Sequence, residues 1–141
     1  MANQAPNHIK YLLATAVINF STHTFKMILM QSGFVFNKDT HALYADVVGS
    51  ELANGNGYTT LGAILAGIAV TEDDTDDRAE IVWSNRSWTA NGGPIGPASG
   101  AIIYDDSVAS DPIVGYIDFL GDYTQPDGGT VTIIAPEVRI S

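Results

Sequence analysis

The chain has 141 residues, which predicts one domain with a core large enough to fold without covalent staples. It contains no cysteine, so disulfide bonds and thiolate metal sites are excluded. The formal net charge of −10, from 16 acidic and 6 basic residues, argues against binding to a nucleic-acid backbone or to anionic lipid. It instead suits a partner surface that carries positive charge.

The composition also favours a chain whose surface is partly covered by other protein. Apolar residues make up 45% of the sequence and charged residues only 16%, against about 25% charged residues in an average domain. Such a surface indicates self-association or a partner. No apolar run reaches the ~18 residues that span a membrane, and residues 1–10 lack the features of a signal peptide. We therefore expect no membrane segment and no export signal.

The first predicted element is a short helix over residues 6–17. Pro6 suits the first helical turn, and apolar side chains recur at helical spacing at Ile9, Leu12, Leu13, Ala16 and Val17. We interpret residues 1–20 as an N-terminal helix or arm and residues 21–141 as the β-sandwich part of a single domain.

A strand is predicted over residues 24–30, whose nearly continuous apolar sequence indicates cover on both faces. In the long connection that follows, Asp39 or Thr40 is expected to open a short helix. The sequence NGNGY at 54–58 predicts a turn. Residues 61–71 are apolar with two glycines, and we interpret them as one strand.

The second half of the chain alternates short apolar runs with turn residues. The acidic segment 72–80 predicts an exposed turn, and the glycine- and proline-rich segment 91–100 predicts a loop without regular structure. The sequence DYTQPDGG, at 122–129, predicts a further turn. The expected strands lie at 80–83, 86–90, 100–105, 112–120 and 130–135.

This pattern predicts a mainly β protein. Short strands separated by Gly, Pro and Asp turns are typical of sandwiches and barrels. We expect a single-domain β-sandwich or jelly-roll-like barrel with a short N-terminal helix.

The acidic segment allows two interpretations. Its carboxylates could bind Ca²⁺, which prefers several oxygen ligands, but the glycine and glutamate positions of an EF-hand loop are not matched. A solvated acidic loop is the favoured interpretation, and a cation site is the alternative. The residues concerned are Glu72, Asp73, Asp74, Asp76 and Asp77.

Other motifs for chemistry are missing from the sequence. His8, His23 and His41 lack the spacing of a zinc site. The chain has no G-x-S-x-G elbow, no P-loop and no dinucleotide-binding glycine motif. We therefore predict no catalytic, cofactor-binding or metal-binding residues and no enzymatic activity.

The sequence Tyr104-Asp105-Asp106 resembles the metal-binding tip of a polymerase hairpin. A palm domain needs a longer chain and more than 6 basic residues, so a strand that ends in a turn is the favoured interpretation. Asp111 before Pro112 fits the same turn. A metal-dependent hydrolase that uses Asp105 and Asp106 is the alternative. We predict that the apolar side chains of the two strands lie in the core or an interface: Ile102, Tyr104, Ile113, Tyr116 and Phe119.

Six aromatic residues also allow two interpretations. They could line a carbohydrate-binding face, or they could fill the core or an oligomer interface. We favour the second. The six are Tyr58, Trp83, Trp88, Tyr104, Tyr116 and Tyr123.

Several separated blocks, in order, resemble a family of small proteins encoded among the virion genes of tailed bacteriophages. The resemblance covers about residues 24–135 and rests on HALYADVVGSELANGNGYTT, AVTEDDTDDRAEIVW, WTANGGPIGPASGAIIYDD, DPIVGYIDFLGD and GGTVTI. It implies a capsid cement or decoration protein, which lies on the outside of the head and clamps neighbouring subunits of the major capsid protein.

The resemblance further implies a compact β-rich domain without an active site, assembled in the host cytoplasm. It implies homodimers or homotrimers, the major capsid protein as partner, and no direct contact with nucleic acid or membrane. We expect the interface to include residues 1–20 and 91–98. The alternative is a glycan- or receptor-binding module of a head or tail fibre.

Overall fold

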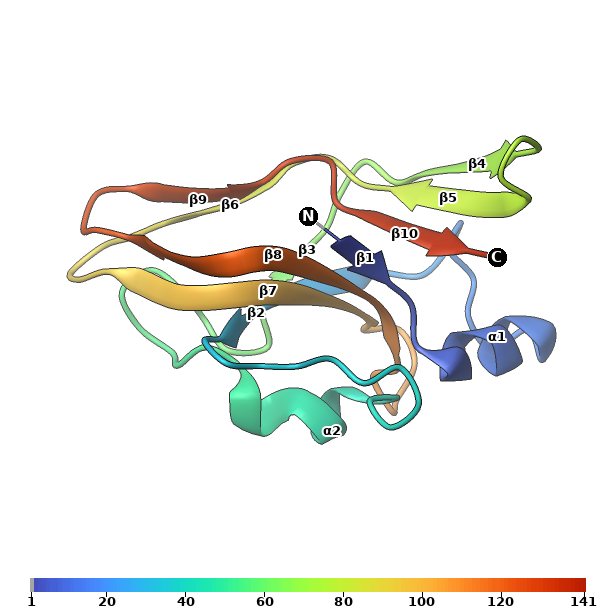
Figure 1. Ribbon diagram of the computed structural model, residues 1–141, viewed down its shortest axis with the longest axis horizontal. Coiled ribbons are helices and arrows are strands. Elements are labelled where there is room, and N and C mark those ends of the chain that lie inside the picture. The colour runs from blue at the N-terminus through green and yellow to red at the C-terminus, as the bar shows by residue number, and fades with distance from the viewer. Residues whose placement is uncertain (1) are drawn as a thin grey trace.

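Two layers of antiparallel strands form the centre of the structure, a computed structural model that describes residues 2–141 (Figure 1). One layer is a five-stranded sheet in the order β1-β8-β7-β2-β3. Its strands are β1 (Ala2–Gln4), β2 (Phe25–Gln31), β3 (Ala63–Ile64), β7 (Ile95–Asp105) and β8 (Ile113–Gln125).

The other layer contains a three-stranded sheet, β10-β5-β4, and a two-stranded sheet, β6-β9. The sheets are open and do not close into a barrel, so the predicted β-sandwich is confirmed and the barrel alternative is not. The strands of this layer are β4 (Ala69–Asp73), β5 (Arg78–Val82), β6 (Arg86–Thr89), β9 (Thr130–Ile133) and β10 (Glu137–Ile140).

Strand β2 is covered on both faces, as its apolar sequence predicts. Met27 and Leu29 belong to the core between the two layers, where Trp83, Trp88 and Val138 meet them. The alternate side chains of β2, led by Ile28, belong to a second core that also includes Phe36 and Val47. The segment before and around helix α2 (Tyr44–Val47) therefore covers the outer face of the five-stranded sheet (Figure 1).

The N-terminal segment packs on the domain. Strand β1 pairs with β8, with Ala2 opposite Asp118 and Gln4 opposite Tyr116. Helix α1 (Asn7–Ala14) buries Ile9 and Leu12 in the main core. The described part of residues 1–20 thus lies against the sandwich.

The first helix is shorter than the sequence predicts, and the second begins later along the chain. Helix α1 ends at Ala14, where the Thr15 hydroxyl donates to the Tyr11 carbonyl at 2.9 Å. The second helix, α2 (Tyr44–Val47), continues as a 3₁₀ turn over Val48–Ser50. Its predicted start at Asp39 or Thr40 is wrong. Among the described residues no helix is long enough to cross a membrane.

The predicted strand over 61–71 is wrong, because glycine backbone divides it. Gly62 and Gly67 have φ angles of +74° and +66°, in the left-handed region that a strand does not adopt. The segment therefore forms the two-residue β3 and, separately, β4. The NGNGY turn is confirmed: Gly55 and Tyr58 donate backbone hydrogen bonds to each other's carbonyls at 2.8 and 2.9 Å.

The loop predicted over 91–100 is only partly present, because β7 begins at Ile95. Register shifts between Ile95 and Ala98, and again between Ala98 and Gly100, break the regular ladder with β8. Pro97 lies within this break, where a missing N–H is tolerated. Strand β8 also continues to Gln125, through residues predicted as a turn, and β10 was not predicted.

Candidate functional site

The acidic segment forms the hairpin between β4 and β5, organised around one cation. Arg78 lies at the start of β5, and its Nη2 atom contacts three carboxylates: Glu80 at 2.6 Å, Asp76 at 3.2 Å and Asp73 at 3.4 Å. The Oδ1 atom of Asp73 also accepts the backbone N–H groups of Thr75 and Asp76, at 3.1 and 3.3 Å. The turn is thus fixed by its own side chains.

These contacts also set the ionisation of the hairpin. Burial opposes ionisation of Asp73, but the N–H groups of Asp76 and Thr75, together with Arg78, hold its pKa below the usual value. The hydrogen bond to Glu80 raises the pKa of Arg78. Asp73 and Arg78 therefore remain charged at neutral pH.

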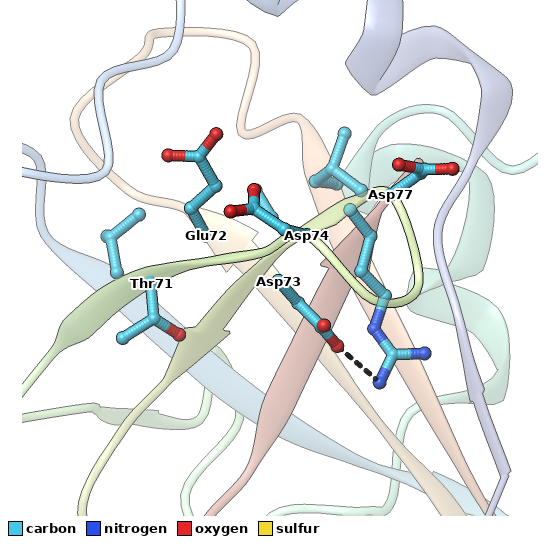
Figure 2. Close-up of a pocket in the computed structure, with 9 residues that line it drawn as sticks. Thr71, Glu72, Asp73, Asp74 and Asp77 are labelled. Atoms are coloured by element: carbon cyan, nitrogen blue, oxygen red, sulfur yellow. Dashed lines mark ion pairs between the residues drawn. The ribbon is translucent and has the colours of Figure 1, made fainter.

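Three further carboxylates point away from this cluster. Figure 2 shows Glu72, Asp74 and Asp77 directed away from Arg78, whereas Asp73 turns toward it. All three are exposed. With residues of β4, β5 and β10 they line an open pocket of about 810 Å³. Strand β4 is an edge strand of its sheet, so the hairpin presents negative charge at an open edge.

The geometry favours the solvated-loop interpretation over the cation site. Within residues 2–141, no group of three or more His, Cys, Asp or Glu side chains is placed to hold a metal ion. Arg78 lies where Asp73 and Asp76 converge. The remaining carboxylates diverge, as Figure 2 shows, so they do not form the converging oxygen shell that Ca²⁺ needs.

The Tyr104-Asp105-Asp106 end of β7 has structural contacts. Asp105 is fully buried, its Oδ2 lies 2.6 Å from His23 Nδ1, and its Oδ1 accepts the Ser107 N–H at 2.9 Å. Asp106 instead forms an ion pair with Lys26 at 3.2 Å. The two aspartates thus have different partners. The bond to Ser107 is the turn chemistry that the sequence predicts, whereas the pair with His23 was missed.

The three histidines lie in different environments. His8 stacks on Tyr11 of α1, with ring centroids 5.9 Å apart. His41 stacks on Phe34 at 5.5 Å and accepts a backbone N–H from Asn37 at 3.1 Å. Together with the His23 contact, these positions show no convergence of the histidines on one site.

A buried polar cluster that the sequence analysis missed surrounds Glu51, which is 5% exposed. Its carboxylate accepts the Tyr58 hydroxyl at 2.7 Å, the Leu61 N–H at 2.9 Å and the Tyr44 hydroxyl. Burial and the Glu51 carboxylate raise the pKa of both tyrosines, so these hydroxyls stay protonated and donate. Tyr104 extends the cluster by donating to the Leu61 carbonyl at 2.6 Å. These hydrogen bonds connect residues 44–61 to the five-stranded sheet.

The aromatic set does not form an exposed platform. Five of its six members, all except Tyr123, are at most 6% exposed. This burial matches the core interpretation and counts against a carbohydrate-binding face. The predicted core residues of β7 and β8 are likewise buried: Ile102, Tyr104, Ile113, Tyr116 and Phe119.

The two segments predicted for an interface do not form one surface. Helix α1 lies at one end of the sandwich, and the connection from β6 to β7, which contains residues 91–94, lies at the other (Figure 1). That connection is held locally, since Asn56 donates to the Pro94 carbonyl at 3.0 Å and Gly92 donates to Asp127 at 2.9 Å.

Models of known protein families, curated proteins and solved structures were all compared with this chain, and none of them matches it.

Proposed function

We propose that this chain is a structural protein of a tailed-bacteriophage virion, a cement or decoration protein that binds the outside of the major capsid shell and stabilises the head. The order of sequence blocks over residues 24–135 supports this proposal. Self-association as a homodimer or homotrimer is part of it. Catalysis and direct contact with nucleic acid or membrane are not.

The observation that carries the proposal is the acidic hairpin. Its exposed carboxylates are Glu72, on the edge strand β4, and Asp74 and Asp77, in the turn that follows. None of the three has an ion-pair partner among the described residues. Meanwhile Asp105 and Glu51 are used in internal bonds. Exposed negative charge on a hairpin whose turn is fixed by other side chains suits docking on a positively charged protein surface.

A small interface per copy is sufficient for head stabilisation when the same docking site is repeated over the shell. A specific interface buries about 800 Å² per partner, and a shell offers the same docking site many times. Each copy therefore contributes a modest free energy of binding, while the many copies together resist the pressure of the packaged DNA.

The test is an add-back experiment with heads stripped of this chain. We expect the purified chain to rebind with saturation and to raise the temperature at which the heads release DNA. Glu72→Gln combined with Asp74→Asn should weaken rebinding at least about tenfold. The control, Asp39→Asn combined with Asp127→Asn, removes the same charge from exposed sites elsewhere and should rebind normally. No rebinding by the unmodified chain would refute the proposal.

A further inference from the structure

An apolar groove lies between the two layers, where β8 and β9 approach each other. The pocket in it has a volume of about 200 Å³ and is lined by Phe119, Tyr123, Gln125, Val131, Thr132 and Ile133. None of these side chains is charged. Tyr123 is 57% exposed, and the neighbouring Leu120 is 71% exposed. The groove is therefore an open part of the sandwich core.

Unpaired strand edges flank this groove. On its outer side β8 pairs with β1 only at residues 116–118, although β8 itself continues to Gln125. Across the groove, β9 pairs only with β6. Among the described residues, the outer edge of β8 beyond Asp118 and the outer edge of β9 thus have no strand beside them. Such edges accept an added strand through main-chain hydrogen bonds.

Strand β1 shows how the edge of β8 is filled. It runs antiparallel to β8, and its Ala2 end, opposite Asp118, points along the free part of the edge (Figure 1). Residues 119–122 of β8 are irregular, since Leu120 has a φ of +60° and the ladder with β7 passes from Asp118 directly to Tyr123. A further strand in the direction of β1 would therefore pass this stretch and resume pairing with β8 near Tyr123. Because side chains of a strand alternate between faces, the added strand would place one of its side chains over Tyr123.

The charge around the groove restricts what can bind there. On the β9 side of the groove, Arg86 is opposite Ile133 in the β6–β9 ladder and stacks on Trp88 at 5.5 Å. On the β8 side, the nearby charges are acidic. Asp118 and Asp122 directly precede Phe119 and Tyr123 in β8, within the range over which surface charges act at physiological salt. An apolar segment whose flanking residues are basic is complementary to the β8 side of the groove.

We propose that the groove binds an extended, apolar and basic segment of a partner polypeptide, which adds a strand to β8 and inserts one apolar side chain into the pocket. The size of the pocket supports a side chain over a small molecule, since pockets for small ligands usually occupy about 300–1,000 Å³. The shell subunit supplies this segment, and this last point rests on the proposed function.

The probe is a short synthetic peptide that alternates lysine with leucine, titrated into the isotope-labelled full chain and followed by backbone NMR. We expect chemical-shift changes at residues 119–125 and 130–133. The same peptide with proline at alternate positions, which cannot pair as a strand, should not bind. Replacement of its lysines by glutamate should weaken binding.

Two variants test the assignment to the groove. Tyr123→Ala removes an exposed side chain that lines the pocket, and Gln125→Lys adds a positive charge at the pocket wall, two residues along β8. Each should weaken peptide binding about tenfold. Tyr11→Ala is the matched control, because Tyr11 is 63% exposed and lies on α1, and it should bind as the unmodified chain does.

Shift changes centred on the acidic hairpin, or equal binding of the proline peptide, would overturn the proposal. So would the absence of any shift at millimolar peptide. The peptide titration does not involve the capsid shell. If the chain binds the peptide in the groove but does not rebind heads, the proposal for the groove stands and the cement function is refuted. Rebinding of heads by Tyr123→Ala at full strength would remove the shell subunit as the source of the segment.

Discussion

The imidazole Nδ1 of His23 lies 2.6 Å from the carboxylate Oδ2 of Asp105, joining the segment before β2 to the end of β7. The carboxylate is fully buried, and burial of a charge is unfavourable unless the charge is paired. His23 is the only side chain of the described residues that bonds to it. Asp105, the first aspartate of Tyr-Asp-Asp, therefore links the end of β7 to the segment that precedes β2.

Removal of this histidine should destabilise the protein. His23→Ala leaves Asp105 with the Ser107 N–H alone, and we expect the free energy of unfolding to fall by about 2–3 kcal/mol. Urea denaturation measures the change. His8→Ala, which removes only a stacking contact on α1, should change it by less than about 0.5 kcal/mol. Equal effects of the two substitutions would contradict the structural role of the pair.

The Glu51 cluster predicts a larger loss. Glu51→Ala removes the acceptor of two tyrosine hydroxyls and of the Leu61 N–H, so it should lower the free energy of unfolding by about 3 kcal/mol or more. Glu51→Gln keeps one acceptor oxygen and should have about half that effect. Glu72→Gln, at an exposed site, is the control and should be nearly neutral. A neutral Glu51→Ala would show that the cluster is not needed.

Two glycines with the same backbone conformation should differ in their tolerance of alanine. Gly62 and Gly33 have φ angles of +74° and +82°. A Cβ atom on Gly62 would lie 1.9 Å from the Met27 carbonyl oxygen, whereas one on Gly33 meets nothing within 4 Å. Gly33→Ala should therefore lower the free energy of unfolding by about 1 kcal/mol. Gly62→Ala should lower it by several times more, because β3 must move away from β2. Similar melting temperatures would contradict this account.

Asp111 predicts a dependence on pH. Burial, then the nearby Asp106 carboxylate, raise its pKa above the usual value. A raised pKa in the folded state favours the protonated form, so this contribution to stability is present at low pH and is lost as pH rises through the folded-state pKa. Asp111→Asn should therefore stabilise the protein at pH 7. It should have little effect near pH 3, where the carboxyl is already protonated. Asparagine also tolerates the φ of +49° at this site.

Thermal unfolding of both proteins at the two pH values measures this difference. Asp39→Asn, at an exposed site for which Lys38 is the ion-pair partner, serves as the control and should not stabilise the protein at pH 7. A stabilising effect of Asp111→Asn that is equal at both pH values would contradict the assigned cause.

Sequence patterns correctly predicted those elements whose conformation is determined by residues close together in the sequence. The apolar run of β2, the helical spacing of Ile9 and Leu12, and the NGNGY turn each specify their own conformation. The strand predicted over 61–71 was wrong, because the apolar character of this segment does not reveal the positive φ angles at Gly62 and Gly67. Pro97 suggested a loop, yet register shifts between β7 and β8 accommodate it within a strand.

The candidate site shows the same division. Five acidic residues in one short segment were visible in the sequence, as was the exposed turn they form. The central position of Arg78 depends on the hairpin register, in which Asp73 pairs with Arg78. His23 and Asp105 are 82 residues apart, and Tyr104 and Leu61 are 43 apart. Contacts of this kind depend on the tertiary fold, and no spacing in the sequence signals them.

The most direct test of the central claim is quantitative mass spectrometry, combined with electron cryo-microscopy, of purified DNA-filled heads produced by the genome that encodes this chain. We expect a fixed number of copies per capsid subunit, with density for a β-sandwich on the outer surface. We also expect that the hairpin over residues 72–77 faces the shell. Heads that contain DNA but lack the chain would contradict the account.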